Sequence, residues 1–200
     1  MKKLLTLAIF IFILANVSAQ NADQKWGISI FGGKTEYVGD LGNGFFDWDP
    51  WVYGHIGVSG NRYLNSSFDL NLQLETGSYG YWESSTSNFY AKKTDGALLL
   101  RYKFNNGYAI KEEALVAPFL TAGFGFASFA AEEDELRTKT DDWDAFVTLG
   151  GGFRFQVDPR FSLEYQFLYN FTNGDERDLN TTDDMNDRFL SHSLGIIFNL

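Results

Sequence analysis

The chain has 200 residues, no cysteine, a formal net charge of −10 and an aromatic share of 18% that includes twenty Phe. The absence of cysteine excludes disulfides and thiol chemistry, and the acidic balance argues against nucleic acid or an anionic lipid surface as the main partner. The many aromatic residues, together with only three prolines, favour β structure in a single domain.

The N-terminal residues have the pattern of a secretory signal. Lys2 and Lys3 precede the apolar run 4–14, and Val17-Ser18-Ala19 supplies the small residues of a cleavage site. We therefore expect residues 1–19 to be a signal peptide and residues 20–200 to form the mature domain, with a net charge of −12 once both lysines are removed. A membrane helix is the alternative interpretation, but the run is short for a span.

Period-two alternation of apolar and polar residues predicts eight strands. In the segment 161–171, aromatic and aliphatic residues alternate with polar ones, and Leu168 is the only apolar residue on the polar side. This segment is long enough to cross a bilayer as a tilted strand, which takes about 9 to 11 residues. The predicted strands are, in chain order, 26–37, 52–63, 68–81, 89–104, 118–130, 143–157, 161–171 and 188–200.

The connections between these strands differ in length and charge. Short or intermediate connections at 64–67, 105–117 and 158–160 alternate with connections at 38–51, 82–88, 131–142 and 172–187. The second set carries formal charges of −3, −1, −4 and −5, together −13, so the rest of the mature chain is nearly neutral. Short turns on one side and longer loops on the other are typical of outer-membrane barrels. We therefore expect the acidic loops outside the cell and both termini in the periplasm.

Aromatic residues collect near both ends of the predicted strands, as in the two interfacial girdles of membrane barrels. Those near the outer end are Trp51, Tyr53, Tyr81, Trp82, Tyr90, Trp143, Tyr169 and Phe171. Those near the inner end are Trp26, Tyr63, Phe68, Tyr102, Phe104, Phe155 and Phe161. The prediction is an all-β fold, an eight-stranded antiparallel up-and-down transmembrane β-barrel.

Short motifs on the first strands resemble a known family. They are Gly32-Gly33, the run Tyr37-Val38-Gly39-Asp40-Leu41-Gly42, and Arg62-Tyr63-Leu64-Asn65 with Phe68-Asp69. The chain resembles the eight-stranded barrel domain of outer-membrane protein A-like proteins over essentially all of the mature sequence. The resemblance implies insertion by the barrel-assembly machinery. Wall anchoring is not expected, because no peptidoglycan-binding domain follows the barrel, and Leu200 stands where an aromatic terminal residue is commoner.

The polar parity of the strands, which faces the lumen of a barrel, gathers charged residues: Asp69, Glu75, Lys93, Asp95, Arg101, Lys103, Asp144, Arg154 and Glu164. The lumen of an eight-stranded barrel is only wide enough for its own side chains, so unpaired charges there would be costly. The turn 158–160 places Arg154 opposite Glu164, and Glu75 and Arg101 share a parity on neighbouring strands. We predict that Glu75, Arg101, Arg154 and Glu164 form a structural charge network that plugs the lumen; a narrow gated pore is the alternative.

No recognisable catalytic constellation is present in the sequence. His55 falls on the lumen parity and His192 on the lipid parity near the outer rim. Ser191 and Ser193 point to the face opposite His192, so this strand is not expected to hold a Ser-His pair. We therefore expect no enzyme activity and no cofactor.

Metal and phosphate sites are not expected either. The acidic segment 183–187 lacks the regular spacing of a calcium loop, so its carboxylates are interpreted as solvated loop residues. Several glycines lie within strands and indicate bends or close contacts rather than a phosphate cradle. They are Gly123, Gly125, Gly150, Gly151 and Gly152.

These observations predict a monomeric, non-catalytic outer-membrane barrel that contacts outer-membrane lipid and has a structural or surface-recognition role. One alternative is a small gated channel or transport-associated protein. Another is a secreted lipocalin-like barrel that binds a small hydrophobic ligand, in which the apolar face would point inward. The loop asymmetry and the aromatic girdles argue against this last alternative.

Overall fold

The computed structural model describes residues 25–38, 53–84, 87–132, 139–172 and 188–200, with the backbone alone described for the residues of these ranges that fall in 81–89 and 131–142. These residues form eight strands, which confirms the predicted all-β fold. The strands are β1 (Trp26–Val38), β2 (Gly54–Tyr63), β3 (Phe68–Ser84), β4 (Ser87–Lys103), β5 (Val116–Glu132), β6 (Lys139–Asp158), β7 (Phe161–Thr172) and β8 (Arg188–Asn199).

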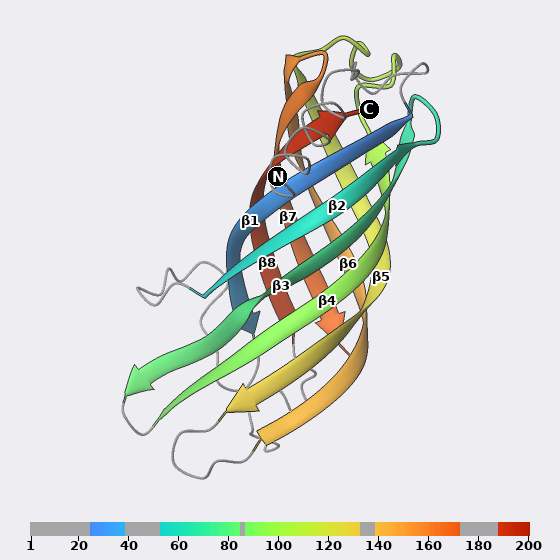
Figure 1. Ribbon diagram of the computed structural model, residues 1–200. Helices are drawn as coiled ribbons and strands as arrows, with labels where there is room; N and C mark the ends of the chain where they lie inside the picture. The colour runs from blue at the N-terminus through green and yellow to red at the C-terminus, as the bar shows by residue number, and fades with distance from the viewer. Residues whose placement is uncertain (1–24, 39–52, 85–86, 133–138, 173–187) are drawn as a thin grey trace, which may run out of the picture.

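The strands close into a barrel in which each pairs antiparallel with its neighbours in the chain, and β1 pairs with β8 (Figure 1). Closure leaves no strand edge unpaired, which a β structure needs in order to cross lipid. The ends of the described chain lie together at the top of Figure 1, beside the connections 64–67, 104–115 and 159–160. We name this the terminal end. The opposite end, where β1 leads to β2, β3 to β4, β5 to β6 and β7 to β8, is the loop end.

The predicted strand boundaries hold to within two residues at the terminal end, and at the loop end they do so except at the end of β3 and the start of β6. There β6 begins at Lys139 rather than Trp143, and Ala131 pairs with Thr140, so half of the connection predicted at 131–142 is strand. The connection predicted at 82–88 shrinks to 85–86 in the same way. Ladder hydrogen bonds do not depend on apolar side chains, so these hairpins continue after the apolar alternation ends. The asymmetry of connection lengths is therefore smaller than predicted.

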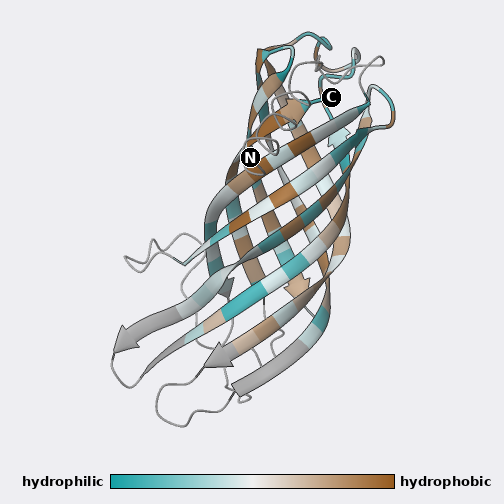
Figure 2. Ribbon diagram, in the orientation of Figure 1, coloured by the Kyte–Doolittle hydropathy of each residue, from teal (hydrophilic) through white to brown (hydrophobic). Residues whose placement is uncertain are grey.

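The apolar parity of the strands faces outward. Ile28, Leu72 and Phe124 are 50%, 53% and 56% exposed, and Figure 2 shows apolar positions recurring along the strands. Exposed apolar side chains on this scale are what a lipid-facing wall requires. The lipocalin-like alternative is wrong, because that fold would bury these side chains in the lumen.

Aromatic rings lie outward at both ends of the barrel. At the terminal end the ring centroids of Phe68 and Tyr102 are 5.4 Å apart, and at the loop end those of Tyr169 and Phe171 are 4.7 Å apart. Trp143, also at the loop end, is 72% exposed. These positions fit the predicted girdles. Trp51 and the side chains of Tyr81 and Trp82 lie outside the described part of the chain.

Glycines make room for phenyl rings inside the barrel. A Cβ atom at Gly125 would lie 2.4 Å from Cζ of Phe146, and a Cβ atom at Gly152 would lie 2.7 Å from Cζ of Phe119. Real Cβ atoms do not approach other atoms this closely, so these strand positions need glycine if the rings are to stay. The close contacts predicted for strand glycines are therefore confirmed at these two positions.

Candidate functional site

Three groups of side chains fill the lumen between the terminal end and the loop end. The terminal-end cluster consists of Asp69, Arg101, Lys103, Arg154 and Glu164. The loop-end cluster consists of Glu75, Lys93 and Asp95. An aromatic cluster lies further toward the loop end and consists of Tyr37, Tyr79, Phe129 and Phe189. Polar residues, among them Asn61, Asn71, Gln73 and Gln166, lie between the two charged clusters.

Arg101 is the centre of the terminal-end cluster. Its Nη1 and Nη2 donate to the two carboxylate oxygens of Glu164 at 2.8 and 2.9 Å, and Nη2 also donates to Oε1 of Gln166 at 2.8 Å. Its guanidinium carbon lies 4.1 Å from the centroid of the Phe119 ring. Arg101 is fully buried, and a paired planar guanidinium on an aromatic face is a favourable way to bury a cation.

Arg154 and Lys103 complete this cluster. The register places Arg154 opposite Glu164, as the turn 158–160 predicted, and Nε of Arg154 donates to Oε2 of Glu164 at 3.1 Å. Nη1 of Arg154 lies 3.6 Å from Oδ2 of Asp69, and Nζ of Lys103 donates to Oδ1 of Asp69 at 2.6 Å. The contact of Arg101 with Glu164 crosses the lumen from β4 to β7, so the pairing of neighbouring strands does not reveal it.

Glu75 does not belong to this cluster, and its predicted pairing with Arg101 is wrong. The register places Asp95 opposite Glu75 and Asp69 opposite Arg101. Glu75 instead accepts a hydrogen bond from Nζ of Lys93 at 2.9 Å, and Asp95 pairs with the same ammonium at 2.7 Å. Shared parity fixes the face on which a side chain lies but not its position along the strand. A hairpin centred on the predicted connection 82–88 already places Asp95 opposite Glu75, so the error came from using parity without register.

Sequence reasoning missed the aromatic cluster. The ring of Phe189 lies 4.8 Å from that of Tyr79 and 5.4 Å from those of Tyr37 and Phe129, and none of the four side chains is more than 3% exposed. These residues occupy the polar parity of their strands, whereas the prediction assigned apolar residues to the lipid face. The sequence does contain a signal for this cluster: Tyr79, for example, has the same parity in its strand as Asp69 and Glu75, and therefore faces the lumen as they do.

The two histidines have different surroundings. His55 lies in the lumen, where Nδ1 is 2.9 Å from the Thr35 hydroxyl and Nε2 is 2.8 Å from the Ser193 hydroxyl. His192 lies on the outer wall with Nδ1 2.8 Å from the Tyr165 hydroxyl. The contact between Ser193 and His55 was not predicted, because it joins strands far apart in sequence. In a catalytic triad a carboxylate contacts the second ring nitrogen of the histidine, whereas Nδ1 of His55 contacts the Thr35 hydroxyl. His55 and Ser193 are also both buried, whereas the nucleophile of a triad must be open to substrate.

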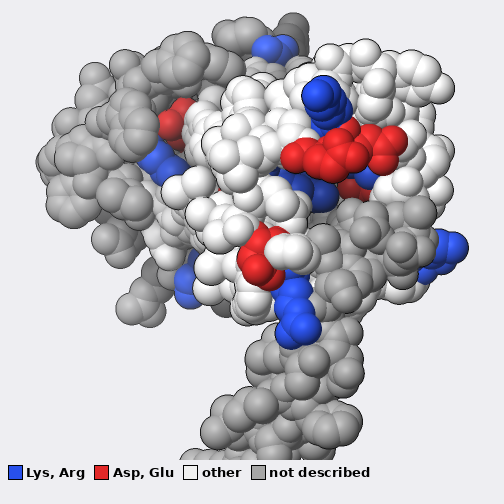
Figure 3. Space-filling model, turned by 90° about the horizontal axis from the view of Figure 1, so that it is seen from above, with Lys and Arg blue, Asp and Glu red and all other residues white. Residues whose placement is uncertain are grey.

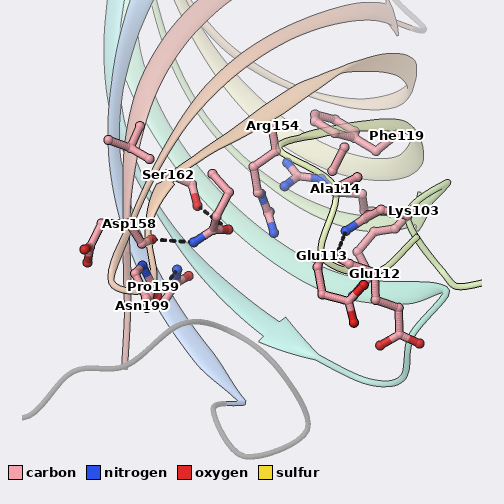
Figure 4. Close-up of a pocket in the computed structure, with 15 residues that line it drawn as sticks. Lys103, Glu112, Glu113, Ala114, Phe119, Arg154, Asp158, Pro159, Ser162 and Asn199 are labelled. Carbon is pink, nitrogen blue, oxygen red and sulfur yellow. Dashed lines mark hydrogen bonds between the residues drawn. The ribbon is translucent and has the colours of Figure 1, made fainter. Parts of the chain in front are cut away.

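A cavity of about 500 Å³ opens at the terminal end (Figure 4). Arg101, Lys103 and Arg154 line its inner part, and Glu112, Glu113 and Asp158 lie at its mouth. Deeper in the lumen, a void of about 10 Å³ between Gln73 and Gln166 has room for roughly one water molecule.

Within the described ranges, no group of three or more His, Asp or Glu residues is placed to hold a metal ion. The same ranges contain no helix that is long and apolar enough to cross a membrane. The acidic segment 183–187 lies outside the described residues.

Solved structures with a similar fold are barrels of bacterial outer membranes. Neisserial surface protein A matches with a TM-score of 0.59 and 16% identity, over 88% of this chain and 97% of its own. Ail, the attachment invasion locus protein of Yersinia pestis, was solved in complex with the heparin analogue sucrose octasulfate. It matches with a TM-score of 0.56 and 13% identity, over 88% of this chain and 99% of its own. The N-terminal β-barrel domain of OprF from Pseudomonas aeruginosa matches with a TM-score of 0.50 and 14% identity, over 88% and 98%. No curated protein sequence matches significantly.

A closed antiparallel barrel with an apolar outer wall and a polar, filled lumen defines a transmembrane β-barrel. The model of the outer membrane protein β-barrel domain matches residues 5–198, so the chain belongs to that family and is a protein of the outer membrane. The resemblance to eight-stranded outer-membrane protein A-like barrels is thereby confirmed.

Proposed function

We propose that this protein is a non-catalytic, non-conducting surface protein, whose barrel anchors acidic connections outside the cell. In this proposal it is a monomer that is inserted by the barrel-assembly machinery and surrounded by outer-membrane lipid. The observation that carries the proposal is the filled lumen. Two ion-paired clusters and a layer of four aromatic rings lie in series along the axis, and the described side chains leave little space between them.

The proposed orientation places the loop end outside the cell and the terminal end in the periplasm. Short turns of outer-membrane barrels face the periplasm, and the connections 64–67 and 159–160 lie at the terminal end. The predicted outer connections carry a formal charge of −13, although most of their residues lie outside the described ranges. Ail binds a polyanion, sucrose octasulfate, whereas this acidic surface favours a basic partner. Retention on heparin that weakens with salt would contradict this choice.

The first prediction concerns conduction. The purified protein, reconstituted into planar bilayers, is expected to show no steady, well-resolved current steps, because the lumen is packed with side chains. A porin reconstituted in the same way is the positive control. Regular current steps that scale with protein concentration would contradict the proposed plug and favour a small gated channel.

The second prediction concerns orientation. The chain has no cysteine, so a single introduced thiol reports one position only. In intact cells, a membrane-impermeant maleimide is expected to label Gly44→Cys, in the connection from β1 to β2, and to leave Ser66→Cys unlabelled until the cells are lysed. Labelling of Ser66→Cys in intact cells would reverse the proposed orientation.

A further inference from the structure

Arg62 is the charged residue of the sequence motif at 62–65, and its charge has no ionic partner among the described residues. Two other polar residues of the motif have clear structural roles. The side-chain oxygen of Asn65 accepts a hydrogen bond from the amide of Phe68 at 2.9 Å, and Asp69 accepts one from Nζ of Lys103 at 2.6 Å. Arg62 takes part in none of the ion pairs of the described chain. The motif therefore contains one cation that the fold does not use in a salt bridge.

Arg62 lies on the lipid-facing wall, within the terminal-end girdle. In the register it stands opposite Trp26 of β1 on one side and Leu70 of β3 on the other. Its guanidinium carbon lies 4.4 Å from the centroid of the Trp26 ring, which is 54% exposed, and Arg62 itself is partly exposed. The cation–π contact holds the guanidinium against the wall but leaves it accessible from the bilayer.

The carboxylates at the terminal end are placed elsewhere. Within the described ranges they lie in the lumen or at the mouth of the terminal-end cavity, and they are Asp69, Glu112, Glu113, Asp158 and Glu164. In Figure 3, which views this end of the molecule, the acidic atoms gather mainly in one group, with basic atoms beside them and further basic atoms toward the edge. Trp26 lies between Arg62 and the last residue, Leu200, whose amide donates to the Trp26 carbonyl. Arg62 therefore needs an anionic group from outside the barrel.

Open space lies beside Arg62 on the side of the bilayer centre. Gly60, two residues along β2, is flanked by Ile28 of β1 and Leu72 of β3 in the register. A Cβ atom at Gly60 would nevertheless have no atom within 4 Å. The wall thus presents a cation at the depth of the girdle, where lipid headgroups lie, and next to it a gap at the depth of lipid chains.

We propose that Arg62, stacked on Trp26, binds the phosphate group of one membrane lipid, whose chains cover Gly60. A planar guanidinium suits phosphate because its donors match two phosphate oxygens at once. The position of Arg62 on the lipid-facing wall favours the phosphate of a headgroup over free phosphate. In the proposed orientation this lipid belongs to the periplasmic leaflet, although the site itself does not depend on which leaflet meets the terminal end.

The test is native mass spectrometry of the refolded full chain released from micelles of a non-ionic detergent, with one added lipid at a time. The probes are dimyristoyl phosphatidylcholine and a galactosyl diacylglycerol with the same acyl chains. Both lipids have no net charge, so the acidic balance of the protein affects them alike, and only the first contains phosphate. The first phosphatidylcholine molecule is expected to bind about fivefold more tightly than the galactolipid.

Three variants separate phosphate recognition from lipid packing. Arg62→Gln is expected to weaken phosphatidylcholine binding about fivefold and to leave galactolipid binding unchanged. Arg62→Lys keeps the charge and is expected to retain most of the affinity. Arg160→Gln is the matched control, because it removes the same charge at the same end from the turn between β6 and β7, and it is expected to bind both lipids like the native chain.

Equal affinities of the native chain for the two lipids, or an equal loss of both in Arg62→Gln, would overturn the proposal. Displacement of phosphatidylcholine by inorganic phosphate would also overturn it, since the site would then take the soluble anion. If Arg62→Gln does not refold, the comparison of the two lipids on the native chain decides. Conduction and surface labelling do not enter this test, so its failure would leave the proposed function standing.

Discussion

Lys93→Met is expected to lower the free energy of unfolding by about 3 to 5 kcal/mol, because it leaves two buried carboxylates without their cation. Glu75 and Asp95 each share the Lys93 ammonium, at 2.9 and 2.7 Å, and their side chains are only 5% exposed. The aromatic cluster lies beside them, with Nζ of Lys93 5.6 Å from the centroid of the Phe189 ring. Urea titration of the barrel in lipid vesicles, followed by tryptophan fluorescence, measures the change.

Lys92→Met is the matched control, because Lys92 is the neighbouring residue on the exposed outer wall. Its expected effect is within about 0.5 kcal/mol. Replacing Glu75 by Gln and Asp95 by Asn in the Lys93→Met background is expected to restore part of the loss, since no uncompensated charge then remains. If the single variant at 93 were as stable as the variant at 92, the loop-end cluster would contribute nothing to the fold.

Gly33→Ala is expected to impair closure of the barrel, with a loss of about 3 kcal/mol or failure to fold, because its methyl group would collide with backbone. A Cβ atom at Gly33 would lie 1.7 Å from the carbonyl oxygen of His192 and 2.9 Å from Cα of Ser193. Gly33 pairs with Ser193 of β8 and with His55 of β2, so the methyl group would push apart the pairing of β1 with β8 that closes the barrel. Gel migration with and without boiling reports the folded fraction.

Gly60→Ala provides the comparison, because no atom lies within 4 Å of a Cβ at that position. This variant is expected to fold like the native chain and to lose at most a few tenths of a kcal/mol. Equal folded fractions for the variants at 33 and 60 would show that β1 and β8 can separate enough to admit a methyl group.

The alternation of residue types predicted the strands and the faces of the barrel wall. Ile28, Leu72 and Phe124 face outward as their parity indicated, and Asp69, Arg101 and Glu164 face inward. Parity is a local property of extended backbone, since successive side chains point to opposite faces whatever the strand pairs with. The turn at 158–160 was also local enough to place Arg154 opposite Glu164.

Parity does not tell which residues of two strands lie opposite each other. Glu75 and Arg101 share a face, but the register places Asp95 opposite Glu75 and Asp69 opposite Arg101. The length of this hairpin was not predicted either, since β3 and β4 continue beyond the apolar band to a connection at 85–86. Where apolar alternation stops, hydropathy no longer indicates whether the ladder continues, although backbone hydrogen bonds can extend it.

The sequence by itself determined a closed, eight-stranded barrel with an apolar wall and a charged lumen, because both follow from the period of two in each strand. Only the tertiary structure decided which charges meet across the lumen and how the rings of Tyr37, Tyr79 and Phe129 gather around Phe189. These features depend on contacts across the lumen between strands far apart in sequence. Such contacts are set by closure of the whole barrel, which no single strand encodes.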